Sequence, residues 1–115
     1  MTVLRVVPDL ATRDLAASRA FYADVLGLVE VMDMGWIVTL AEPDRSRQIS
    51  LMTHDATGPV VPTLSVEVDD VDAAHAAAVA AGAEIVHPLS DEEWGVRRFF
   101  VRDPGGHVVN VLAHR

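Results

Sequence analysis

The sequence predicts an α+β fold in which two paired βαβββ modules form a curved mixed sheet around a cup, with the helices on the outer face. The prediction rests on a repeat, because one helical segment and four short apolar runs occur twice in the same order. Turn residues recur in step with this order, and Thr57-Gly58-Pro59 separates the two copies. The matched landmarks are Gly27 and Gly82, Trp36 and Trp94, Pro43 and Pro104, and His54 and His114.

The first module is expected over residues 1–56. Val3–Val7 is rich in β-branched residues and bounded by Pro8, which predicts a first strand. Asp14 is placed to cap a helix that runs to Leu26, where Gly27 tolerates the left-handed conformation that ends a helix. Turn residues then separate three short strands, which are Leu28–Met32, Trp36–Leu40 and Gln48–Met52.

The second module is expected over residues 62–115, after a linker at 57–61. Thr63–Val68 alternates polar and apolar residues, as a half-buried strand does. Asp70 or Asp72 caps a helix over Val71–Ala81, which Gly82 ends. One such module is too small to close a core, so we expect the two to pair as a single domain. The remaining strands are Ala83–Val86, Val96–Val101 and Val108–Leu112.

The composition excludes several classes of chemistry. The 115 residues include neither cysteine nor lysine, which removes disulfides, thiol nucleophiles and Schiff-base chemistry. A net charge of −8 argues against nucleic acid as a partner, because phosphate binding needs a basic face. No apolar run is long enough for a membrane span, and the N-terminus lacks signal-peptide organisation, so a cytoplasmic protein is expected. The acidity favours a cationic small molecule or serves solubility alone.

Five aspartates lie near the expected helix starts. Carboxylates in such positions cap helices and interact favourably with the helix dipole, which we expect to account for most of them. Paired-carboxylate chemistry is therefore not assigned to Asp9, Asp14, Asp69, Asp70 and Asp72.

Two parts of the chain carry distinctive motifs. Val6-Val-Pro-Asp-Leu10 precedes Asp14-Leu-Ala-Ala-Ser-Arg-Ala-Phe-Tyr-Ala-Asp-Val-Leu-Gly-Leu28, and the chain closes with Asp103-Pro-Gly-Gly-His-Val-Val-Asn-Val-Leu112. Together they resemble the vicinal oxygen chelate superfamily, which includes glyoxalase I, extradiol dioxygenases and bleomycin resistance proteins. Pro8 and the segment from Trp94 to Gly106 are similar to the bleomycin resistance branch. That resemblance implies a homodimer in which Pro8 is a hinge for exchange of the N-terminal strand.

The resemblance also raises the question of a metal. Enzymes of this superfamily usually hold a divalent ion with histidine and glutamate ligands on inward-facing strand positions. The matching positions here are Val7, Ser50, Thr63 and Asn110, and this set will not hold zinc or iron. We therefore expect neither a metal nor another cofactor. The histidines are expected on loops, rims or an exposed helix face, and they are His54, His75, His87, His107 and His114.

Alternation along the strands identifies a mixed polar face as the candidate ligand site. The opposite faces, which include Leu4 and Val6, are expected to pack on the helices. The two tryptophans either stack on a flat ligand or close the ends of the core, and the acids before Trp94 either attract a cation or form a solvated loop. The candidate ligand-binding residues are Arg5, Trp36, Gln48, Ser50, Met52, Thr63, Ser65, Glu67, Trp94, Phe99 and Asn110.

Three functional hypotheses follow. The first is a metal-free binding protein of the glyoxalase/bleomycin-resistance type that sequesters a cationic or aromatic small molecule, such as an antibiotic, without turnover. The second is a lyase, isomerase or dioxygenase of the same superfamily, with a displaced metal site or Glu67 as a base. The third is a structural or regulatory dimer whose cup is filled by its own side chains.

Overall fold

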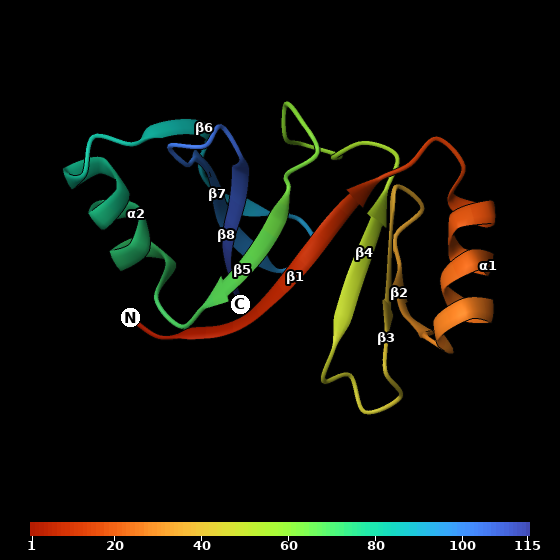
Figure 1. Ribbon diagram of the computed structural model, residues 1–115. Helices are drawn as coiled ribbons and strands as arrows, with labels where there is room; N and C mark the ends of the chain where they lie inside the picture. Colours follow the sequence, from red (N-terminus) through yellow and green to blue (C-terminus); the bar gives the residue numbers. More distant parts are fainter. The chain divides into compact units, whose positions relative to one another are not determined.

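The computed structural model describes residues 1–115, which form two compact units (Figure 1). The N-terminal unit comprises residues 7–61, and the C-terminal unit comprises residues 1–6 and 62–115. Strand β1 (Val3–Ala11) runs from one unit into the other. The N-terminal unit also contains α1 (Leu15–Leu26), β2 (Val29–Asp33), β3 (Ile37–Ala41) and β4 (Gln48–Met52). The C-terminal unit contains β5 (Leu64–Val68), α2 (Val71–Ala80), β6 (Glu84–Glu92), β7 (Val96–Arg102) and β8 (Val108–His114).

Each unit has the predicted βαβββ order and a mixed sheet, so the predicted α+β fold is confirmed. In the N-terminal unit the strands lie in the order β2-β3-β4-β1, with β1 and β4 parallel and the other pairs antiparallel. In the C-terminal unit the order is β5-β8-β7-β6, with β5 and β8 parallel. The parallel pair in each unit brings together the first and last strands of the repeat.

The predicted helix caps are confirmed at both helices. The Asp14 carboxylate accepts a hydrogen bond of 2.9 Å from the Ala17 backbone N–H, and Asp70 accepts one of 3.0 Å from the Ala73 N–H. Gly27 ends α1 with φ at 69°, the left-handed conformation that favours glycine. Neither helix is long and apolar enough to cross a membrane.

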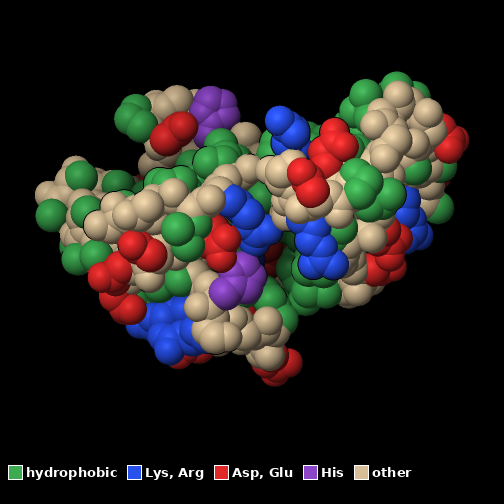
Figure 2. Space-filling view, turned by 90° about the horizontal axis from the view of Figure 1, so that it is seen from below, with side chains coloured by type: hydrophobic (Ala, Val, Ile, Leu, Met, Phe, Trp, Pro, Cys, Tyr) green, Lys and Arg blue, Asp and Glu red, His purple; other side chains and the backbone are tan.

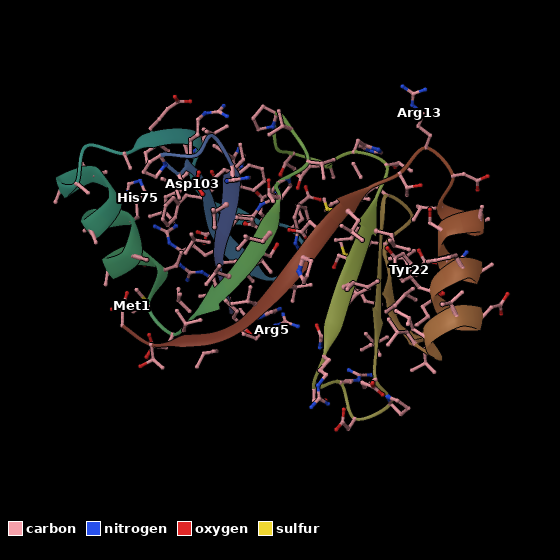
Figure 3. All side chains as sticks on the ribbon, in the orientation of Figure 1. Met1, Arg5, Arg13, Tyr22, His75 and Asp103 are labelled. Carbon is pink, nitrogen blue, oxygen red and sulfur yellow. The ribbon has the colours of Figure 1, made fainter.

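One helix covers one face of the sheet in each unit. In the N-terminal unit Leu15 and Tyr22 pack on a core of Val38, Leu40 and Leu51, and Figure 3 shows Tyr22 pointing from α1 toward the strands. In the C-terminal unit Val71 of α2 shares a core with strand residues, which are Val68 and Phe99. The other face of each sheet is therefore the one that is left for function.

Two strands continue through a proline and well beyond their predicted ends. Strand β1 passes through Pro8, because its pairing with β4 begins at Asp9, so the missing proline N–H interrupts no bond of that ladder. Strand β6 passes through Pro88 because the register shifts on both sides of His87, and such bulges free individual residues from ladder bonds.

The expectation for Leu4 and Val6 is wrong. Both side chains are 57% exposed, and neither belongs to a core cluster. The reason is that α1 and α2 each cover the strands of their own repeat, which leaves this face of β1 without a helix.

The Asp103–His107 turn provides a test of the electrostatics. Hydrogen bonds from the His107 backbone N–H and from its ring lower the pKa of Asp103 below the ordinary value of 3.8. A depressed carboxyl pKa stabilises the fold above its unfolded value, and that contribution is lost as the pH falls through the folded pKa. We expect Asp103→Asn to lower the urea midpoint at pH 5–7 and to differ progressively less from the wild type below about pH 4. A difference that stays constant down to pH 2 would contradict this assignment.

Candidate functional site

The face of the C-terminal sheet opposite α2 is polar, and we call it the polar face. The register places Ser65, Asn110, Phe100 and His87 side by side across β5, β8, β7 and β6. The row beside it contains Glu67, Leu112 and Arg98. Charged groups of both signs and histidines are interspersed on the surface that Figure 2 shows.

Asn110 is the central polar residue of this face. Asn110 is 7% exposed, and its amide Nδ2 donates a hydrogen bond of 3.0 Å to the Ser65 hydroxyl. Its Oδ1 is buried and has no hydrogen-bond partner. An unpaired buried polar group costs roughly 1–3 kcal/mol, so the position of Asn110 is unfavourable for the free protein.

Glu67 is held between two basic groups. One carboxylate oxygen lies 3.0 Å from Arg5 Nε, and the other is hydrogen bonded to His114 Nδ1. Figure 3 shows Arg5 projecting from β1. Both oxygens of the candidate base therefore already have partners on the polar face.

A second ionic group on the polar face is almost wholly buried. Arg98 Nε lies 3.4 Å from Glu92 Oε1, and the two side chains are 3% and 5% exposed. The Arg98 guanidinium also stacks on two aromatic rings, at 5.1 Å from the centre of Trp94 and 4.8 Å from that of Phe100. Glu92 further accepts from His87 Nε2 at 3.1 Å. The acid beside Trp94 is thus part of a packed network, and the solvated-loop interpretation is wrong for Glu92.

The structure changes the choice of aromatic residues. Phe99 points to α2, is buried in the core and packs edge-on against His75 at 5.0 Å, so its assignment to the ligand face is corrected in favour of Phe100. Figure 3 shows His75 on the inner side of α2. Neither Trp36 nor Trp94 belongs to a core cluster.

The N-terminal unit carries the remaining predicted site residues on the face opposite α1. Ser50 and Thr39 share a buried hydrogen bond of 2.9 Å between their hydroxyl groups. Val7 and Met52 are buried, whereas the Gln48 amide donates to the Arg45 carbonyl at 3.0 Å, toward the turn before β4. The half-buried Trp36 lies beside His54, with ring centres 6.3 Å apart.

Asp9 and His87 are residues that sequence reasoning misplaced. Asp9 lies within β1 opposite Ser50 and is buried, so it caps no helix. His87 lies inside β6 and is 9% exposed, so the expectation of a rim histidine is wrong. A proline predicts the end of a strand, but β1 and β6 continue through Pro8 and Pro88. The two-residue spacing of Val7 and Asp9 is the signal that places Asp9 in the strand, on the same face as Val7.

The residues at the superfamily's metal positions do not fit a divalent metal. Val7 offers no donor atom, while Ser50 and Asn110 offer neutral groups that already bond to the neighbouring strand. The backbone N–H of Thr63 donates to the Val108 carbonyl at 2.8 Å, which fixes the start of β5. Nowhere in the chain do three or more histidine, aspartate or glutamate side chains form a group suited to a metal ion.

Solved structures share this fold at low sequence identity. A superfamily member from Vibrio splendidus is 23% identical with a TM-score of 0.75, over 99% of this chain and all of that one. Methylmalonyl-CoA epimerase from Mycobacterium tuberculosis is 22% identical with a TM-score of 0.68, over 98% and 87% of the two chains. A Legionella pneumophila protein described as NAD-dependent benzaldehyde dehydrogenase is 16% identical with a TM-score of 0.77, over 96% and 100%. These likenesses show the fold alone.

Sequence comparison gives the family. Uncharacterised proteins of Mycobacterium bovis and Mycobacterium tuberculosis are 43% identical over 56 residues, which is 49% of this chain but only 37% and 33% of theirs. The model of the Glyoxalase/Bleomycin resistance protein/Dioxygenase superfamily matches residues 3–111. Because that match spans nearly the whole chain and agrees with the observed fold, the chain belongs to this superfamily.

Proposed function

We propose that this chain is a metal-independent binding protein of the bleomycin-resistance type, which sequesters a small aromatic molecule on its polar sheet face. The observation that carries the proposal is the buried Asn110 Oδ1 without a partner. Asn110 stands at one of the superfamily's metal-ligand positions, so a ligand N–H or O–H group would bond where metal-using relatives place an ion.

The paired acids favour binding over catalysis. Glu67 is the base that the alternative enzyme hypothesis requires, but Arg5 and His114 occupy both of its oxygens. Each oxygen would have to accept the substrate proton in competition with the basic group that it already binds. The alternative of a displaced metal site finds no supporting group of acidic or histidine side chains.

The same pairing refines the ligand class. Glu67 and Glu92 each have an arginine at 3.0–3.4 Å, so neither carboxylate presents an uncompensated charge to a cation. The half-buried Trp94 supplies flat apolar surface on the same face, while the fully buried Phe100 lies beneath the Arg98 guanidinium. We therefore propose that an aromatic group, and not a positive charge, is the main recognition element of the ligand.

The homodimer is proposed on the resemblance and on exposed apolar side chains. The outer face of β1 leaves Leu4 and Val6 exposed, and α1 leaves Phe21, Val25 and Leu26 exposed. A second copy of the chain would remove such surface from water. Strand exchange about Pro8 stays a prediction.

Replacing Asn110 tests the binding role through the stability of the free protein. Asn110→Leu removes the unpaired acceptor but also the hydrogen bond to Ser65, so we expect it to change the free energy of unfolding by well under ~1 kcal/mol while abolishing ligand binding. Thr39→Val is the matched control, because it removes one partner of the satisfied Thr39–Ser50 pair and should cost about 1 kcal/mol. Urea unfolding measures both variants. An Asn110→Leu variant destabilised as much as Thr39→Val would contradict the proposal.

Tryptophan fluorescence tests the ligand class. Bleomycin and neutral flat aromatics such as acridine are expected to quench the wild type, and Trp36→Phe should retain most of this quenching. Trp94→Phe should lose it, because Trp94 stacks with Arg98 on the polar face and Trp36 lies in the other unit. Quenching that no probe produces, or that survives Trp94→Phe unchanged, would overturn the aromatic-ligand proposal.

A further inference from the structure

His87 is the one buried histidine whose hydrogen bonds are incomplete. It is 9% exposed, and Phe100 lies against its ring with the two centres 5.1 Å apart. Its Nε2 lies 3.1 Å from the Glu92 carboxylate, whereas its Nδ1 is not one of the buried unpaired atoms and is therefore open to water. A neutral imidazole has one donor nitrogen and one acceptor nitrogen, so one of the two has no partner within the protein.

The contact with Glu92 decides which ring nitrogen carries the proton. An ionised carboxylate only accepts hydrogen bonds, so Nε2 must carry the proton in this pair. In the neutral ring the lone pair then belongs to Nδ1. Arg98, 3.4 Å from the same Glu92 oxygen, favours the ionised carboxylate and hence this tautomer. Glu92 and Arg98 are the charged groups that face the pair.

Burying the Arg98–Glu92–His87 network lowers the stability of the fold, which indicates that the network serves a ligand. Burying an ion pair costs solvation that its attraction offsets only in part, and well-packed apolar residues often replace such pairs without loss of stability. Here an arginine and a glutamate are buried beside a histidine whose Nδ1 is open to water, on the side of the sheet that carries Asn110. His87 and Asn110 flank Phe100 on adjacent strands, which puts their Cα atoms about 10 Å apart. This separation suits an aromatic ligand that carries a polar substituent on its ring.

We propose that His87 Nδ1 accepts a hydrogen bond from a weakly acidic O–H group, such as a phenol hydroxyl, on the ligand of the polar face. The inference rests on the proposed function and adds to it a chemical requirement, namely a protic substituent on the aromatic group. Glu92 is a positioning residue, because it acts through the His87 tautomer.

The test uses two probes that differ by one proton donor, phenol and anisole. The full-length protein is labelled with [15N]histidine and titrated with each probe by NMR. We expect the wild type to bind phenol roughly three- to ten-fold more tightly than anisole, which corresponds to one neutral hydrogen bond. The His87 Nδ1 resonance should move with phenol and not with anisole.

Variants at His87 identify the atom responsible. The amide of His87→Gln reaches the position of Nε2 and still donates to Glu92, but it has no atom at Nδ1. We expect this variant to fold normally and bind phenol and anisole equally. His107→Gln, in the exposed turn before β8, is the matched control and should keep the wild-type preference.

Three results would overturn the inference. They are a wild type that binds the two probes equally, a phenol preference that survives in His87→Gln, and a neutral His87 ring with its proton on Nδ1. Equal binding of both probes with quenching of Trp94 leaves the proposed function intact. Binding of neither probe, together with no quenching by acridine, contradicts the inference and the proposed function alike.

Discussion

Each sheet in this molecule buries one face against a single helix, and the two-residue period of the strands then decides which side chains remain for function. In β7 this constraint separates two adjacent phenylalanines, since Phe99 packs on α2 and Phe100 lies beside Asn110 on the polar face. The same alternation keeps Ser65 and Glu67 away from the core that contains Val68. Chemistry on this scaffold is therefore confined to one side of each repeat.

The polar face of the C-terminal unit is built at a cost in stability. It buries an arginine, a glutamate and a histidine, and it leaves the Asn110 carbonyl without a partner. The N-terminal unit treats the corresponding position differently, because Ser50 is satisfied by Thr39 and is flanked by the apolar Met52. The two repeats thus share a backbone plan but differ in their polar groups, and the unpaired Asn110 acceptor lies in the C-terminal one.

The sequence predicts the repeat, both helix caps and most strand positions, because glycines, prolines, aspartates and alternating apolar residues act locally. Proline favours strand ends at Pro8 and Pro88, but a bulge or an unpaired position lets each strand continue there. Asp9 and His87 therefore lie buried inside strands, where the local pattern predicts none. The Arg98–Glu92 contact depends on register between β7 and β6, which no local pattern specifies. The sequence predicts Arg5 and Glu67 on the same polar face but does not predict the ion pair between them.

The central claim is that this superfamily member recognises its ligand through neutral hydrogen-bonding groups and aromatic rings where metal-using relatives employ an ion. Elemental analysis tests this most directly. The protein would be expressed in medium supplemented with zinc, iron, nickel and manganese, purified without chelators and analysed by inductively coupled plasma mass spectrometry. The account predicts that each metal is present far below one equivalent per chain. The account would be contradicted by one equivalent of any of these metals per chain, if a chelator that removes the metal also abolishes ligand binding.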